Sequence, residues 1–190
     1  MIGRIMNPLA LFRRRPHALA RFAGDRRGVS AVEFALLAPL MIGLYLGGVE
    51  ISQGVGIYRK VTLTAGAIAN LSAQASSISN ADMTNVLDAG AAIIAPYSTS
   101  TLKITVTCLA IDATGKATVS WSDTRNGTAR AVGSVVTIPA ALAVPSTSLI
   151  FSEVSYSYTP VVGYIITGVL NLADKMYMSP RLSATVARTA

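Results

Sequence analysis

A glycine, Gly28, is followed five residues later by a glutamate, Glu33, and then by Phe34, at the start of a long apolar segment. A charged side chain inside an apolar segment of membrane length costs about 2.5–3.5 kcal/mol on insertion scales, so such a residue is usually functional. The chemistry open to a carboxylate in that setting is pairing with a cation. Glu33 is therefore the first candidate functional residue.

Other residue types that carry chemistry are few or scattered. The single histidine, His17, lies among arginines near the start of the chain. Cys108 is the single cysteine, so no intrachain disulfide is possible, and we expect it to be a small buried apolar residue. No glycine loop suited to phosphate binding occurs, and we expect no enzyme activity, no metal site and no cofactor. The acids beyond the apolar segment show no paired spacing: Asp82, Asp88, Asp112, Asp123, Glu153 and Asp174.

The positive charge of the chain is concentrated at its start. Residues 1–27 contain seven arginines against one acid, Asp25, which gives a net charge of +6. The remaining residues hold nine bases and eight acids. A basic arm can bind nucleic acid, but beside an apolar segment an arginine excess more often keeps that side of the membrane protein in the cytoplasm. We therefore expect a membrane protein and no nucleic-acid partner.

The apolar segment is long enough to cross a bilayer. Sixteen residues from Phe34 to Val49 carry no charge, and residues 29–51 are interrupted mainly by Glu33 and Glu50. A bilayer core needs about 20 helical residues. We expect one transmembrane helix over residues 29–51, after a basic cytoplasmic leader of residues 1–28.

Small residues recur along one face of this predicted helix. Gly43, Gly47, Glu50 and Gly54 follow one another at steps of three and four residues, a spacing typical of close helix packing in membranes. Pro39 should bend the helix, because proline removes a backbone donor. One interpretation is a contact face for a partner helix; the other is that glycine is simply common in membrane helices.

Beyond the span the pattern favours more helix and then strands. Apolar and small residues at a 3.6-residue period extend the helix over residues 52–73. Residues 72–80 read as a loop, and Ser79 or Asn80 would cap a second helix that ends near Ala95, before Pro96. Residues 161–172 are too short to span and are expected to form a membrane-proximal or packing helix.

Alternation of apolar and polar residues predicts several strands in residues 74–190. One hairpin joins 102–111 to 117–121 through a turn at Asp112–Lys116, and Asn126-Gly127 marks another turn. Further strands are expected at 134–138 and 148–158. The fold class is thus α+β: a long N-terminal transmembrane and amphipathic helix, followed by a small antiparallel, β-rich domain outside the cytoplasm.

The segment from Gly28 to Glu50, with its core Val32-Glu-Phe-Ala-Leu-Leu-Ala-Pro-Leu40, resembles the TadE-like family of pseudopilins. These are minor components of the Tad (tight adherence, Flp-type) type IVb pilus machinery. The stretch Glu153-Val-Ser-Tyr-Ser-Tyr-Thr-Pro160 and the later Pro180-Arg181 are similar to the distal pattern of the family. The length fits both the TadE and the TadF type.

The resemblance implies a pilin-like fold for the β-rich domain and a function in pilus biogenesis and surface adherence. A prepilin peptidase would cleave after Gly28 on the cytoplasmic side of the bacterial inner membrane, leaving Val29 as the new N-terminus. Glu33 and Phe34 would complete the processing site. The implied partners are this peptidase, other Tad pilins and pseudopilins, and inner-membrane Tad assembly proteins. The protein would stay in the membrane, with its C-terminal domain periplasmic, or enter the pilus.

Two interpretations of Glu33 remain open. The carboxylate would pair with the N-terminal amine of a neighbouring subunit, which partly offsets both desolvation costs and sets the register of assembly. Alternatively, because Glu33 is near the helix start, it only reaches the lipid head groups.

Two rival functions are weighed against this one. A cleavable secretory signal is disfavoured, because the small-residue sites Ala67-Ile-Ala69 and Ala73-Gln-Ala75 lie far beyond the arginines. The alternative from another class is an uncleaved single-pass membrane protein whose β-rich domain binds a ligand or surface. The identity of the mature N-terminus, Val29 or Met1, separates the two.

Overall fold

The computed structural model describes residues 28–160, 163 and 167–190. The basic leader up to residue 27, and residues 161–162 and 164–166 of the predicted helix at 161–172, lie outside the described residues. The chain divides into two compact units, Met1–Tyr45 and Leu46–Ala190, and each is treated by itself.

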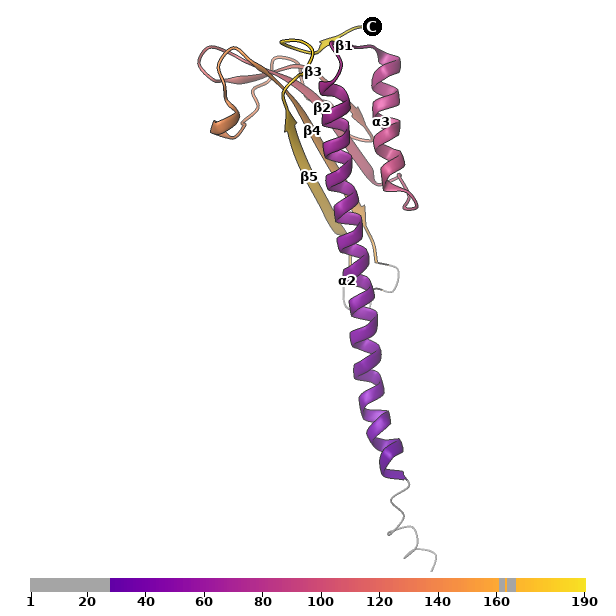
Figure 1. Ribbon diagram of the computed structural model, residues 1–190. Coiled ribbons are helices and arrows are strands. Elements are labelled where there is room, and N and C mark those ends of the chain that lie inside the picture. Colours follow the sequence, from indigo (N-terminus) through magenta and orange to yellow (C-terminus); the bar gives the residue numbers. More distant parts are fainter. Residues whose placement is uncertain (1–27, 161–162, 164–166) are drawn as a thin grey trace, which may run out of the picture. The chain divides into compact units, whose positions relative to one another are not determined.

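Helix α2, Val29–Ala73, has 45 residues and belongs to both units (Figure 1). At 1.5 Å per residue it is about 68 Å long. The expected helix over 29–51 and its extension to residue 73 are confirmed as one continuous element, which runs through Pro39.

Helix α3, Asn80–Ile94, begins with the expected cap. The Ser79 hydroxyl accepts a hydrogen bond from the Asp82 backbone N–H at 3.2 Å, and the Asp82 carboxylate accepts one from the Ser79 backbone N–H at 3.0 Å. These reciprocal bonds satisfy donors that the first helical turn leaves free. At its other end, Lys60 Nζ of α2 donates to the carbonyl oxygens of Ile93 at 3.0 Å and Ala95 at 2.7 Å. A cation thus stabilises the C-terminus of α3 and ties it to α2.

Four antiparallel strands form the main sheet, in the order β3-β2-β4-β5. In the register, Ile104 of β2 lies opposite Val154 of β4, and Val154 lies opposite Asp174 of β5. The expected hairpin and the expected strand at 148–158 are confirmed. A two-stranded parallel pair joins distant parts of the chain. The bounds are β1 Ser77–Ile78, β2 Leu102–Ile111, β3 Ala117–Arg125, β4 Ser148–Tyr158, β5 Leu170–Met178 and β6 Ala187–Arg188.

The predicted strand at 134–138 is wrong. In that segment only Val135 forms a bridge, with Thr118 of β3. Gly133 precedes it in the left-handed region, with φ of 80°, and Pro139 follows it. Between these two residues the backbone forms only a few hydrogen bonds with β3, so no strand develops.

The predicted helix at 161–172 is wrong where the structure describes it, because Leu170–Leu172 begin β5. The side chains of Leu170, Leu172 and Met176 pack against the core at steps of two or four residues. This period of two belongs to a strand with one buried face.

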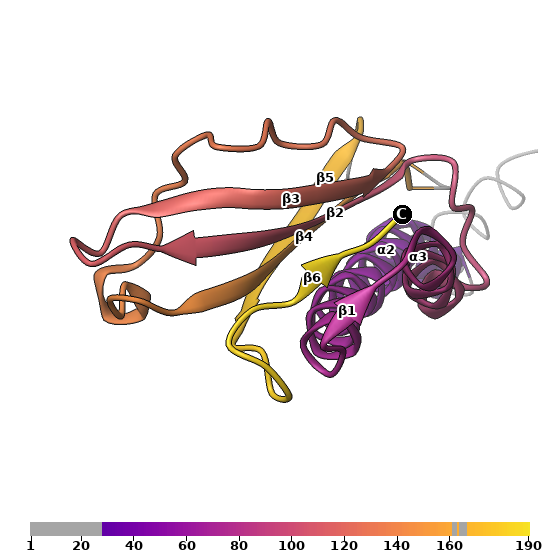
Figure 2. The same ribbon diagram turned by 90° about the horizontal axis from the view of Figure 1, so that it is seen from above.

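Helices α2 and α3 cover one face of the sheet (Figure 2). Ile57, Val61 and Ile68 of α2 are fully buried there with Ile104 of β2 and Val154 of β4, which are 0–1% exposed. Cys108 belongs to the same core, as expected, and burial raises the pKa of its thiol.

The segment 181–188, which we name the C-terminal strap, closes the end of this core that lies near β1, at the top of Figure 1. The Trp121 indole N–H donates to the Val186 carbonyl at 2.7 Å, and the Ser148 hydroxyl donates to the Ala184 carbonyl at 2.6 Å. Arg188 of β6 forms a two-bond ion pair with Asp123 of β3, at 2.8 and 3.2 Å. Side chains from two strands are thus fixed by a segment that follows both of them in the chain.

The other face of the sheet is apolar at one end and polar at the other. Around Phe151 it forms a second, smaller core under residues 136–142. The Phe151 and Tyr177 rings stack at 4.5 Å between centroids, and the Arg130 guanidinium lies 5.4 Å above Phe151. The polar end carries the groove described below.

Candidate processing and assembly helix

Gly28 lies immediately before the first residue of α2. It is exposed, and a Cβ built on it would meet no described atom within 4 Å. Packing within the described chain therefore does not require a glycine at this position. A requirement for glycine here would come from outside the chain, for example from the narrow cleft of an enzyme that must accept the backbone.

Glu33 lies one turn into α2, with an exposed side chain. Among the described residues no side chain or backbone group forms an ion pair or a hydrogen bond with the Glu33 carboxylate. Phe34, beside it, is 72% exposed, and Val29 is 51% exposed. The four residues predicted to form a processing site are thus open to an external partner, while pairing of Glu33 with a second subunit stays a prediction.

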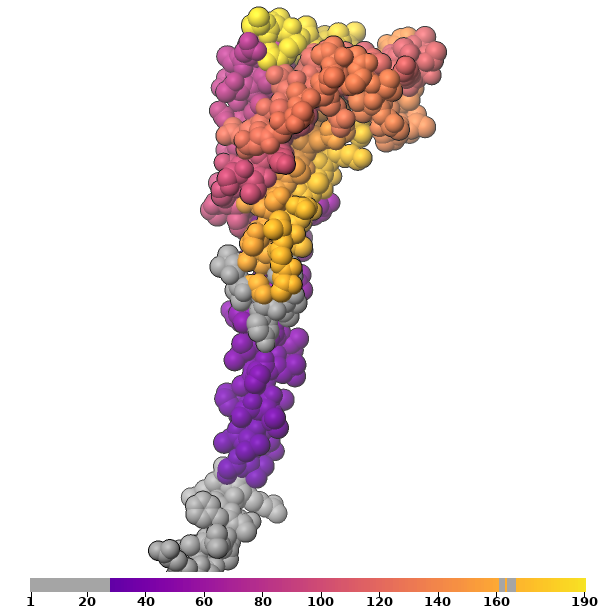
Figure 3. Space-filling model, turned by 180° about the vertical axis from the view of Figure 1, so that it is seen from behind, coloured from indigo at the N-terminus to yellow at the C-terminus, as the bar shows by residue number. Residues whose placement is uncertain are grey.

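The first part of α2 is apolar on every side. Large apolar side chains at neighbouring positions, such as Leu36, Leu37, Leu40 and Met41, are all 57–74% exposed, so no single face is covered. Figure 3 shows one side of this segment, in indigo, with its side chains bare. A helix that is apolar all round belongs in a core or in a membrane. Among the described residues, α2 is the one helix long and apolar enough to cross a bilayer.

The predicted small-residue face becomes buried in the second half of α2. Gly43 is half-buried and Pro39 exposed, whereas Gly47 is buried and Glu50 is 1% exposed. At Gly54 a Cβ would lie 3.9 Å from Leu170 Cδ1 of β5. From Gly47 onward this face serves packing within the domain, and its contact with a partner helix stays a prediction.

The acids of the domain take structural positions. Asp88 pairs with Arg125, Asp123 with Arg188, and Glu153 with Arg130. Hydrogen bonds from Thr114 hold the pKa of the Asp112 carboxyl, in the β2–β3 turn, below its ordinary value. Across residues 28–160, 163 and 167–190, no three His, Cys, Asp or Glu side chains cluster in a way that could hold a metal ion.

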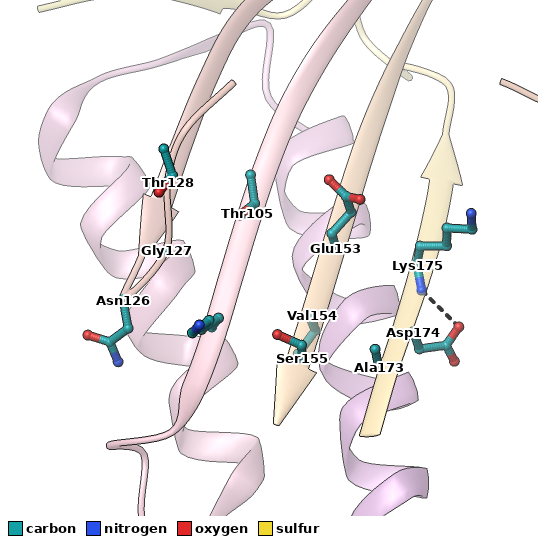
Figure 4. A pocket seen from close by; sticks show the side chains of 11 residues that line it. Thr105, Asn126, Gly127, Thr128, Glu153, Val154, Ser155, Ala173, Asp174 and Lys175 are labelled. Atoms are coloured by element: carbon teal, nitrogen blue, oxygen red, sulfur yellow. Dashed lines mark hydrogen bonds between the residues drawn. The ribbon is translucent and has the colours of Figure 1, made fainter. Parts of the chain in front are cut away.

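Sequence reasoning missed a groove of about 710 Å³ on the open face of the sheet (Figure 4). Its floor combines residues of three strands, and the segment Asn126–Thr128 forms one side. The lysines 103 and 175 line it, 72 positions apart in sequence. Alternation of apolar and polar residues predicted β2 and β4, but β5 was not predicted as a strand, and only the strand register brings these lysines to one place.

Comparison with protein families places one match on α2. Residues 28–69 match the family model described as TadE-like protein, which supports the resemblance seen in the sequence. The match begins at Gly28 and covers both the bare apolar part of α2 and most of its buried part. No curated protein and no solved structure matched the chain.

Proposed function

We propose that this chain, whose residues 28–69 match the TadE-like family, is a minor pseudopilin of a Tad (Flp-type) pilus system. A prepilin peptidase removes the basic leader after Gly28, and the processed protein acts in pilus biogenesis and surface adherence through its helix. The observation that carries the proposal is the coincidence of the family match with an exposed glycine at the start of a bare apolar helix. No catalytic role is assigned to the chain itself.

The charge distribution supports a direction of insertion. The seven arginines of residues 1–27 would stay at the cytoplasmic surface, where anionic lipids attract them. The domain would then lie outside the cytoplasm of a bacterial inner membrane. Cleavage removes the net +6 charge of the leader and frees the helix to leave the bilayer for an assembly.

The first experiment determines the mature N-terminus. The full chain is co-expressed with the prepilin peptidase of its own system and analysed by intact mass spectrometry. We expect a product that begins at Val29, and a Gly28→Asp variant that keeps the leader. Gly24→Asp is the matched control, because it adds the same acid to the leader away from the cleaved bond and should be processed normally. Retention of Met1 in the unmodified chain would instead indicate an uncleaved, membrane-anchored binding protein.

The second experiment separates processing from assembly. A Glu33→Gln variant should be cleaved after Gly28 but should assemble poorly, because its side chain no longer carries the charge that pairs with a neighbouring amine. Glu33→Asp keeps the charge and should restore part of the assembly. Pilus counts by electron microscopy, together with the mass of the processed chain, give both readouts. Normal pilus numbers in Glu33→Gln cells would contradict the pairing role and would favour the head-group interpretation.

A further inference from the structure

The groove on the open face of the sheet owes its shape to the strand register. Lys103, Ser155 and Ala173 lie side by side on β2, β4 and β5, and the next row on this face holds Thr105, Glu153 and Lys175. The two lysines therefore stand at diagonal corners, with their Cα atoms about 12 Å apart from strand spacing and rise. The short side chains of Ser155 and Ala173 lie between the two lysines, so the hollow lies over them and the longer lysine side chains border it.

The charges in the groove are not balanced internally. Glu153 is held by Arg130, whose Nε and Nη2 donate to Oε2 at 3.1 and 2.6 Å. Asp174 also borders the groove, but its carboxylate accepts a hydrogen bond from Thr62 of α2, on the other face of the sheet. Among the described residues neither Lys103 nor Lys175 has an ion-pair partner. The lining therefore has two lysines without an ion-pair partner, while its acids, Glu153 and Asp174, bond to residues outside the lining; with Arg130 counted, the charges sum to +1.

The lining favours a saccharide over a peptide. An extended peptide usually binds through main-chain hydrogen bonds at a sheet edge, or through apolar pockets for its side chains. Here the floor is the face of the sheet: β2 and β4 are inner strands whose main-chain groups already bond to neighbours on both sides, and the edge strand β5 contributes side chains to the lining. What the groove offers is hydroxyl groups, such as those of Ser155 and Thr128, between two cations.

We propose that this groove binds an acidic oligosaccharide, a chain of uronate-type sugars whose carboxylates reach Lys103 and Lys175. Its sugar hydroxyls exchange hydrogen bonds with the serine and threonine hydroxyls and donate to Glu153. The site is separate from α2, and its occupation does not depend on cleavage after Gly28.

The test measures binding of a galacturonate hexamer to the full chain in detergent micelles by isothermal titration calorimetry. Lys103→Gln and Lys175→Gln should each weaken binding about fivefold, the range of an exposed ion pair, and the double variant more. Lys116→Gln is the matched control, because it removes an exposed lysine in the β2–β3 turn, outside the groove lining. Ala173→Phe should abolish binding by filling the floor while both lysines remain. Unchanged thermal unfolding of each variant excludes a folding defect.

Three results would overturn the proposal. The first is no measurable binding of the hexamer by the unmodified chain at low ionic strength, where electrostatic attraction is strongest. The second is equal loss of affinity in Lys116→Gln, which would indicate unspecific charge attraction. The third is equal or tighter binding of a poly-glutamate peptide, or of a neutral galactose oligomer, which would assign the groove to another ligand.

Discussion

The packing of α3 on α2 yields a sharp test at Gly90. A Cβ placed on Gly90 would lie 2.4 Å from Ile68 Cδ1, 2.9 Å from Ile68 Cγ1 and 3.3 Å from Ile104 Cδ1. Carbon atoms in ordinary contact are about 3.5–4.0 Å apart, so even one methyl group overlaps its neighbours here. Ile68 and Ile104 are both fully buried, which leaves their side chains little room to move away. Overpacking of this kind costs about 1–3 kcal/mol.

A second glycine in the same fold supplies the matched control. Gly66 also lies inside a helix, but a Cβ there would be 4.0 Å from its nearest neighbour, Met176 Cε. Gly66→Ala should therefore stabilise the protein by about 1 kcal/mol, through helix propensity alone. Gly90→Ala gains the same helix propensity but also causes the overlap. Its free energy of unfolding should therefore be lower than that of Gly66→Ala by roughly 1–3 kcal/mol.

The assay follows Trp121, the single tryptophan, whose side chain is buried in the domain. Thermal unfolding of the full chain in detergent, monitored by its fluorescence, should give a higher midpoint for Gly66→Ala than for Gly90→Ala. Each kcal/mol corresponds to about 2–4 °C in a chain of this size. Equal stabilisation by both variants would refute the reasoning, because it would mean that α3 can move away from α2 at no cost.

Three further predictions concern the contacts that close the domain. Trp121→Phe should lower stability by about 1–3 kcal/mol, measured by circular dichroism, because it leaves the buried Val186 carbonyl without its donor. Lys60→Met keeps the apolar stem but removes two bonds to the end of α3; we expect a loss of about 1–2 kcal/mol, and an unchanged unfolding midpoint would contradict the contact. Hydrogen bonds from Ser79 lower the pKa of Asp82 below its ordinary 3.8 in the folded state, so its contribution is present above pH 3.8 and is lost as the pH falls through the lower, folded value. Asp82→Asn should remove this part of the acid-induced loss, which acid titration of the unfolding midpoint can measure.

Elements defined by local patterns were predictable from the sequence. The strands 102–111 and 148–158 and the cap at Ser79 follow from alternation, turn residues and capping chemistry within a few positions. The bare helix after Gly28 follows from its run of apolar residues. For these elements, short-range preferences and the final packing favour the same conformation.

Features that depend on long-range pairing were not predictable. The pair β1–β6 joins residues 110 positions apart through two residues on each strand, which leaves no recognisable pattern. The Lys60 ammonium group donates to carbonyl groups 33 and 35 positions further along the chain, at the end of α3. The two lysines of the groove are 72 positions apart, and no sequence pattern links them. A single-sequence pattern carries periodicity but no register, so it could not reveal these contacts.

The C-terminal strap also has a consequence for the timing of folding. Arg181 donates its backbone N–H to the Ala73 carbonyl, and β6 pairs with β1, so the strap contacts the chain near the end of α2. Residues 181–188 are made long after those segments, at a synthesis rate of roughly 5–20 residues per second. Until they emerge, Trp121 and Asp123 lack their partners and this end of the core stays open to solvent. The ribosome therefore makes most of the domain seconds before the segment that closes it is available.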